Sequence, residues 1–330
     1  MKNIGIGHGS GGSLTRELIR NIILKHLGSD ELSPLEDASY IKLNGAETAI
    51  TTDSYVIRPL FFQGGDIGKL SVCGTINDLA VSGAVPEYLT VGLVIEEGFP
   101  IESLEEIISS MGKASREASV SIVAGDTKVV ERGKCDGIYI NTTGVGRVVR
   151  PLLINEVSAG DKVIVTGSLG DHGTAIALSR DGFEIEADVK SDCASLKELL
   201  MPLFDIKGVR WMRDPTRGGV STVLAELADS SGLGVEIREE SIPVREDVRF
   251  ISDMLGCDPL YIANEGKAVI ITSGETAEEV ITLLRKHPLG AKTAMIGDIS
   301  SEFSGVRLKT VIGGLRTLDL LDEEMLPRIC

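Results

Sequence analysis

Two successive halves of similar size, each alternating extended apolar runs with helical patterns, constrain the fold of this 330-residue chain more than any other feature. In the first half, apolar periodicity predicts strands at 38–43, 48–52, 89–95, 121–124 and 137–149, and helices at 14–27, 67–82 and 101–118. In the second half, it predicts strands at 162–166, 234–238, 260–263, 268–272, 293–296 and 306–310, and helices at 174–179, 219–230 and 277–287.

A break between the halves is predicted at Arg150-Pro151 and at the Ser158–Asp161 turn, because Pro and Gly interrupt regular elements. We therefore expect an α/β (α+β) fold with two lobes, residues 1–155 and 156–319. Functional side chains are expected in the loops between strands and helices. Residues 320–330 would form a mobile tail, because chain ends are poorly ordered unless they are docked.

The formal charge of −16 argues against nucleic acid or an anionic membrane as a partner, since both require a basic surface. No apolar stretch approaches the roughly 18 residues of a membrane span, and no signal peptide is recognisable. Five scattered cysteines without a Cys-x-x-Cys pair fit free thiols in a reducing compartment. The expected location is the cytoplasm.

Carboxylates recur in turns of small residues at the ends of apolar runs or within a helical pattern. They are Asp37, Asp53, Asp78, Asp126 and Asp214. Oxygen ligands of this kind suit Mg²⁺, which prefers one or two carboxylates together with substrate phosphates. Solvated or helix-capping carboxylates are the alternative interpretation of each position taken singly.

Three other segments carry candidate functional groups. The glycine-rich loop 7–12 could cradle a phosphate with its backbone amides, or it could be a loop without a role, since it is neither a Walker A nor a Rossmann sequence. Glu265, at the junction of two apolar runs, could act as a general base or form a polar hairpin turn. For His8 and His172 a functional and a structural role both stay open.

The sequence ends at Cys330. A terminal thiol on a tail of eleven residues, which can extend on the order of 36 Å at roughly 3.3 Å per residue, could carry a group between active sites. The thiolate would be the nucleophile.

Several blocks together resemble one family. The ending Pro-Arg-Ile-Cys at 327–330 is similar to the end of the HypE family, the carbamoyl dehydratases of [NiFe]-hydrogenase maturation. Internal blocks of the same family follow in order at 8–12, 51–55, 77–80, 125–128 and 214–219. The internal blocks alone indicate the wider PurM-like (AIR synthetase-related) superfamily, and the tail ending in cysteine makes the resemblance specific.

This resemblance implies a two-lobed PurM-like fold, with an N-terminal mixed sheet that forms a homodimer and a C-terminal α/β lobe. ATP and Mg²⁺ would lie between the lobes. The carbamoyltransferase HypF would load Cys330, ATP would drive dehydration of the carbamoyl group to a thiocyanate, and the HypC–HypD complex would receive cyanide. The roles assigned on this basis are metal binding for Asp37, Asp53, Asp78, Asp126 and Asp214, nucleotide binding for Gly9, Gly11, Gly12, Asp53, Lys128 and Lys134, and catalysis for Cys330, Glu265 and His8.

Two alternatives remain at this level. A selenophosphate-synthetase-like phosphotransferase of the same superfamily would carry a reactive cysteine in the N-terminal glycine-rich loop, whereas this loop holds His8 and Ser10. A non-catalytic scaffold would use Cys330 to hold iron or a partner thiol, but a metal site usually needs several ligands and the tail has one thiol.

Overall fold

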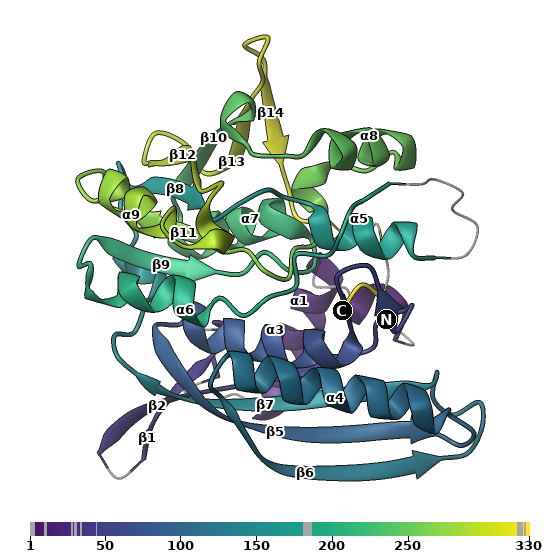
Figure 1. Ribbon diagram of the computed structural model, residues 1–330. Helices are drawn as coiled ribbons and strands as arrows, with labels where there is room; N and C mark the ends of the chain where they lie inside the picture. The colour runs from purple at the N-terminus through teal and green to yellow at the C-terminus, as the bar shows by residue number, and fades with distance from the viewer. Residues whose placement is uncertain are drawn as a thin grey trace.

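A computed structural model describes residues 4–9, 12–27, 29, 32–33, 35–43, 45–180, 187–321, 326 and 328–330. Two large sheets, one from each half of the chain, dominate the described residues, and helices lie between and around them (Figure 1). The mixed α/β fold with two lobes is thus as the sequence predicts. The boundary proposed at 155/156 falls in a 3₁₀ turn, η3 (Ile154–Glu156), between the last strand of the first sheet and the first strand of the second.

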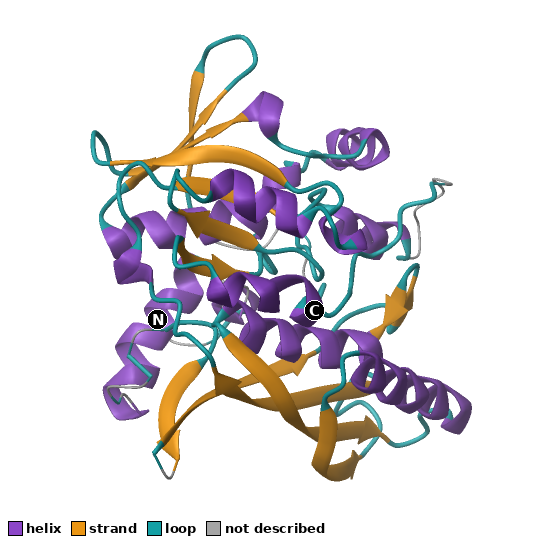
Figure 2. Ribbon diagram, turned by 60° about the vertical axis from the view of Figure 1, so that its left-hand side comes forward, coloured by secondary structure: helices purple, strands orange, loops and turns teal. Residues whose placement is uncertain are grey.

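The N-terminal sheet has five strands. Their order is β1 (Ser39–Leu43), β2 (Ala46–Tyr55), β7 (Ile138–Val148), β5 (Ala84–Glu96) and β6 (Ser121–Val130). Neighbours are antiparallel except β5 and β6, which are parallel and joined through α4 (Ile101–Glu117). A parallel pair requires such a crossover. Figure 2 shows helices on one face of this sheet and none on the other.

The helix α3 (Ile67–Val81) occupies the centre of the molecule, between the N-terminal sheet and the C-terminal lobe (Figure 1). Asp66 caps it by accepting hydrogen bonds from the backbone N–H groups of Gly68 and Lys69 at 2.7 and 3.1 Å. Every residue of the helix except Lys69 and Asp78 is buried. A helix that is apolar on all sides belongs in a core, so the one carboxylate near its end stands out.

The C-terminal sheet has seven strands. Their order is β14 (Leu315–Leu318), β13 (Gly305–Lys309), β10 (Gly234–Arg238), β12 (Ala294–Ser300), β8 (Lys162–Val165), β11 (Val269–Thr272) and β9 (Val209–Arg213). Only β10 and β13 run parallel. The helices of this lobe are α5 (Asp171–Leu178), α6 (Lys197–Leu200), α7 (Gly219–Ser231), α8 (Glu246–Leu255) and α9 (Ala277–Leu284).

The N-terminal segment forms α1 (Ser13–Leu18), which continues through a π-helical turn, η2 (Ile19–Ile23), into α2 (Leu24–Leu27). Arg16 of α1 pairs with Glu226 of α7 at 3.2 Å, so this segment packs against the C-terminal lobe. The short hairpin β3 (Phe61–Phe62) and β4 (Gly65–Asp66) precedes α3. No helix within the described residues is long and apolar enough to cross a membrane.

Most predicted elements exist, and the differences have local causes. The run 260–263, predicted as a strand, is instead a 3₁₀ turn, η6 (Pro259–Tyr261), capped by the side chain of Asp258. Its apolar residues are buried without strand pairing, and periodicity alone cannot separate these two cases. The elements β9, α6, α8 and β14 were not predicted from the sequence.

Candidate active site between the two lobes

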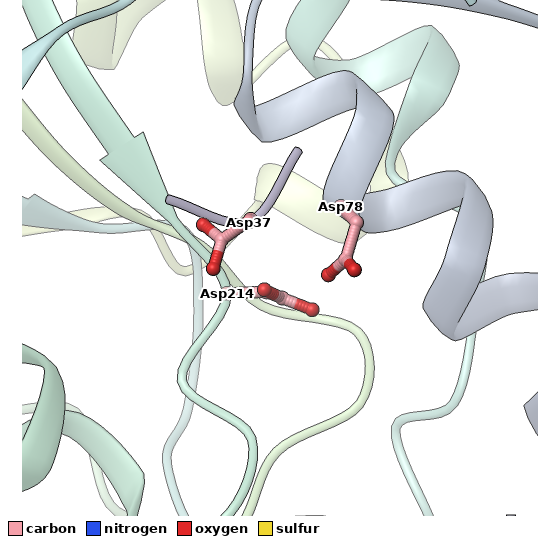
Figure 3. Close-up of side chains that lie close together, drawn as sticks. All are labelled: Asp37, Asp78 and Asp214. Carbon is pink, nitrogen blue, oxygen red and sulfur yellow. The ribbon is translucent and has the colours of Figure 1, made fainter. Parts of the chain in front are cut away.

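Three carboxylates from distant segments meet where the lobes join. Asp37 lies just before β1, Asp78 in the last turn of α3, and Asp214 directly after β9. One ligand oxygen of each lies within 4.8 Å of the others. Figure 3 shows the three side chains facing one another from three separate pieces of backbone. The tertiary fold therefore makes one cluster from residues that are 177 positions apart at the extremes (214 − 37).

Burial dominates the electrostatics of this cluster. Burial, and then the charges of the neighbouring carboxylates, raise the pKa of Asp78 and of Asp214 well above 3.8. Burial also raises the pKa of Asp37 to about 6, although Arg213 opposes the rise through an ion pair of 2.7 Å. Oδ2 of Asp214 is buried and has no hydrogen-bond partner in the described part of the chain. A cluster of carboxylates with one unpaired buried oxygen fits the ligand preferences of Mg²⁺.

Asp53 extends the acidic region along β2. Its Oδ2 accepts hydrogen bonds from the hydroxyl groups of Thr75 at 3.1 Å and Tyr55 at 3.4 Å. Thr51, two residues earlier on the same strand face, donates to Oδ2 of Asp78 at 2.7 Å. Burial raises the pKa of Asp53. Threonine hydroxyls thus hold two carboxylates side by side, and the strand period of two residues puts both contacts on the face that meets α3.

The turn that carries Asp214 is fixed by two glycines and one asparagine. Gly218 and Gly219 have φ values of +75° and +60°, and a Cβ on Gly219 would lie 2.5 Å from the carbonyl oxygen of Leu260. Only glycine fits such a close backbone approach in the left-handed region. The side chain of Asn264 donates to the carbonyl of Pro215 at 3.2 Å, which ties this turn to the segment that holds Glu265.

Glu265 is 2% exposed and comes from the loop before β11. Its backbone N–H donates to Oδ1 of Asp192 at 3.0 Å, and its carbonyl accepts from Asn77 of α3 at 3.2 Å. Oε1 has no hydrogen-bond partner within the described residues. Burial, and then the charges of Asp214 and Asp192, raise the pKa of Glu265 well above 4.5. A carboxylate held by its backbone with a free, desolvated side-chain oxygen is suited to accept a proton.

The end of the chain enters this site. The backbone N–H groups of Arg58 and Val56 donate to the carbonyls of Arg328 and Cys330 at 3.1 and 3.2 Å, so the tail runs antiparallel to residues 56–58. Ile329 is 2% exposed within the apolar core of the N-terminal lobe. The sequence predicts a mobile tail. In the structure, burial of Ile329 and these backbone hydrogen bonds dock residues 328–330.

Three of the aspartates, together with Glu265 and Cys330, line a small cavity of about 50 Å³. Its lining residues are Asp53, Ser54, Tyr55, Gly74, Asp78, Asp214, Thr216, Arg217, Glu265 and Cys330. The carrier thiol predicted from the sequence, the candidate base and three of the candidate metal ligands thus face one space. Thr216 and Arg217 belong to a block that the sequence singles out, but neither residue is predicted as a site residue.

The N-terminal loop lies beside this cavity. The guanidinium of Arg217 donates to the carbonyl of Gly9 at 2.7 Å, and Gly12 caps α1. His8 is buried, and its Nδ1 accepts a hydrogen bond from the N–H of Gly5 at 3.1 Å, which gives it a local structural contact. Gly11 lies outside the described residues.

Asp126 does not join the acidic cluster of its own chain. Asp53 on β2 pairs with Thr142, Thr142 with Val91, and Val91 with Gly125, so three strand spacings, roughly 14 Å at about 4.8 Å each, separate β2 from β6. Alternation along β6 also turns Asp126 to the opposite face of the sheet. It pairs there with Lys128 at 2.5 Å, and both side chains are exposed. Lys134 is exposed in the turn before β7.

Comparisons with known proteins agree on a single family. The AIR synthase related protein models match at residues 35–148 for the N-terminal domain and 158–308 for the C-terminal domain. The chain is 45% identical to "Carbamoyl dehydratase HypE" of Escherichia coli (strain K12) over 339 aligned positions that cover all of both chains.

Solved structures give the same result. A HypE in complex with ATP matches with a TM-score of 0.84 and 43% identity, covering 99% of this chain and 100% of that one. The HypE of a HypE–HypF complex matches with a TM-score of 0.88 and 40% identity, covering 92% and 99%.

Proposed function

This chain belongs to the HypE carbamoyl dehydratases, within the AIR synthase related proteins, and we propose that it uses ATP to dehydrate a carbamoyl group carried on its own Cys330. The observation that carries this proposal is the position of Cys330 in a cavity with Glu265, Asp78 and Asp214. The product would be a thiocyanate that supplies the cyanide ligand of a [NiFe]-hydrogenase.

The reaction explains why these groups are needed together. Converting S–C(=O)–NH₂ to S–C≡N removes the elements of water, and oxide is a poor leaving group. Attack of the carbonyl oxygen on the γ-phosphorus of ATP releases ADP and converts that oxygen into a phosphate ester. One N–H proton leaves as the C=N bond forms. The second leaves as the C–O bond breaks and inorganic phosphate departs.

Glu265 is the candidate acceptor for these protons. Glu265 lines the same cavity as Cys330, its Oε1 has no hydrogen-bond partner among the described residues, and a raised pKa makes it a stronger base than an exposed glutamate. Burial excludes water, which would otherwise compete for the phosphate and hydrolyse the product.

The acidic cluster fits a magnesium–nucleotide site. Asp37, Asp78 and Asp214 would hold Mg²⁺, with Asp53 adjacent, and the metal would neutralise charge on the phosphates. Arg217, which lines the cavity and donates to the carbonyl of Gly9, supplies positive charge beside the carboxylates. The solved structure of a HypE in complex with ATP supports nucleotide binding by this chain.

The test follows the mass of the C-terminal peptide. Brief treatment with cyanate, which adds to thiolates as a carbamoyl group, loads Cys330 without a partner protein. Adding Mg-ATP should then lower the mass of that peptide by one water, whereas ADP should not. Carbamoylated peptides that contain the other four cysteines should keep their mass. A loaded Cys330 peptide whose mass is unchanged by Mg-ATP would contradict the proposal.

A second copy of the chain is the proposed partner of strand β6. This edge strand is exposed at nine of its ten residues, including Ile122, Val123 and Val129. A long apolar edge of this kind pairs or aggregates unless something covers it. Asp126 and Lys128 would then lie at the interface between copies and could reach a nucleotide only in the neighbouring copy. HypF as the carbamoyl donor and the HypC–HypD complex as the acceptor complete the proposed partners, the former supported by a solved HypE–HypF complex.

A further inference from the structure

His172 makes a buried contact with the tail that the reaction described above does not use. It is the second residue of α5 and is fully buried. Its Nε2 lies 2.6 Å from the carbonyl oxygen of Ile329, and its Nδ1 lies 2.8 Å from Oγ of Ser191. The ring of Phe62 packs edge-on against it, with the centroids 5.6 Å apart.

The acceptor character of the carbonyl fixes the direction of these bonds. A carbonyl oxygen can only accept, so Nε2 carries the hydrogen and donates to Ile329. In a neutral ring Nδ1 then accepts from the hydroxyl of Ser191, and Oγ of Ser191 in turn accepts the N–H of Cys193 at 3.1 Å. Burial lowers the pKa of His172, which keeps the ring neutral and this arrangement populated.

The same short segment also fixes the candidate base. Asp192, next to Ser191, accepts the N–H of Glu265 through Oδ1 and pairs with Lys267 through Oδ2, each at 3.0 Å. Both members of this ion pair are buried. Residues 191–193 therefore hold the tail through His172 on one side and the backbone of Glu265 on the other.

We propose that His172 is a positioning residue that holds Ile329 so that the sulfur of Cys330 lies opposite Glu265. This role rests on the proposed function, in which Cys330 carries the reacting group, and it is argued from the contacts that His172 makes with the tail. The ion pair of Arg328 with Asp136 is a weaker anchor, because these side chains are 34% and 42% exposed, and surface pairs contribute little. His172 adds a desolvated hydrogen bond one residue from the thiol.

The first test measures the reactivity of Cys330 without ATP or partners. We would follow labelling of the C-terminal peptide by N-ethylmaleimide in the wild type, in His172→Leu, which removes the donor, and in His172→Gln, whose amide can still donate. His172→Leu should label about tenfold faster, the change in an equilibrium expected for one net hydrogen bond, and His172→Gln should stay near the wild type. Ser191→Ala should also accelerate labelling, and serves if His172→Leu does not fold.

A matched control separates positioning from general packing. Ser252 of α8 is also fully buried and donates to the carbonyl of Val248, with no hydrogen bond to the described residues of the tail, so Ser252→Ala should leave labelling unchanged. In a single turnover of cyanate-loaded protein, His172→Leu should dehydrate about tenfold more slowly at saturating ATP, with unchanged ATP affinity, because one net hydrogen bond is lost.

The two assays also separate this inference from the proposed function. The positioning role is overturned if a folded His172→Leu variant labels at the wild-type rate. It is also overturned if this variant labels faster but dehydrates the carbamoyl group at the wild-type rate. Absence of dehydration in the wild type would contradict the proposed function while leaving the labelling comparison valid.

Discussion

At the scale of single residues, the carboxylates of the candidate site act by being crowded and desolvated. Asp214 is buried next to the partly buried Asp37 and Asp78, and Arg213 forms an ion pair with Asp37. Without a bound metal, such a cluster destabilises the fold, because desolvated like charges repel. The position of the cluster is therefore better explained by ligand binding than by stability.

The first prediction concerns Asp214→Asn. A carboxyl whose pKa is raised by folding stabilises the protein fully below its unfolded pKa, near 3.8, and loses that contribution as pH rises through the folded pKa, which burial raises well above 3.8 for Asp214. In metal-free protein, the melting temperature of Asp214→Asn minus that of the wild type should therefore grow as the pH rises from about 4 to about 8, by ~2–4 °C per kcal/mol. Thermal melts across this range measure it, and a difference that is flat with pH contradicts it. Added Mg²⁺ should stabilise only the wild type.

The second prediction concerns Glu265→Gln. The amide keeps the shape of the side chain but cannot accept the proton, so dehydration of loaded Cys330 should fall by about 10²–10⁴-fold. The affinity of Glu265→Gln for Mg-ATP, measured by calorimetry, should be unchanged. In the control Glu302→Gln, at an exposed position, both the dehydration rate and the Mg-ATP affinity should be unchanged. In the wild type, the dehydration rate should fall on the acid side with a midpoint above pH 4.5, because the pKa of Glu265 is raised above that value. Full dehydration activity of Glu265→Gln would show that another residue acts as the base.

At the scale of elements, the site depends on turns that only glycine can form. Gly219 has φ +60° and close backbone neighbours, whereas Gly232, which ends the same helix, has φ +73° with nothing within 4 Å of an added Cβ. Both glycines have left-handed backbone conformations, but only Gly219 has neighbours that an added Cβ would overlap. Comparing the two therefore separates the cost of the conformation from the cost of the overlap.

The third prediction compares Gly219→Ala with Gly232→Ala. Gly232→Ala should cost about 1–2 kcal/mol of unfolding free energy, the usual cost of the left-handed conformation. Gly219→Ala should cost about 3 kcal/mol, because the overlap with Leu260 adds ~1–3 kcal/mol, and it should weaken Mg-ATP binding by moving Asp214. Denaturant unfolding and calorimetry measure both effects. Equal costs for the two variants would show that the turn relaxes freely.

At the scale of the whole molecule, the uncovered edge strand β6 is the surface at which we propose that a second copy binds. The strand β6 presents apolar side chains along its length, and one face of its sheet carries no helix (Figure 2). A second copy would cover this region.

The fourth prediction compares two valines that are each 67% exposed. Val129 lies on β6 and Val311 at the tip of the β13–β14 hairpin. A buried, unpaired charge opposes association, so Val129→Glu should shift the protein from dimer to monomer at micromolar concentration, whereas Val311→Glu should stay dimeric. Light scattering gives the masses. A wild type that is monomeric, or a Val129→Glu variant that remains a dimer, would place the interface elsewhere or remove it.

The sequence by itself determined the two-lobed α/β architecture, most strands and helices, and the family, because periodicity, glycine turns and short motifs are local features of a chain. It also marked Asp37, Asp78, Asp214, Glu265 and Cys330 as candidates. Only the tertiary structure decided which of them meet: Asp37, Asp78 and Asp214 converge across the lobe interface, while Asp126 lies three strands away on the opposite face. The contact of His172 with Ile329 joins residues 157 positions apart, and the hydrogen bond between Val56 and Cys330 joins residues still farther apart. No local pattern encodes such distances. They depend on burial and hydrogen bonds that exist only once both lobes are packed.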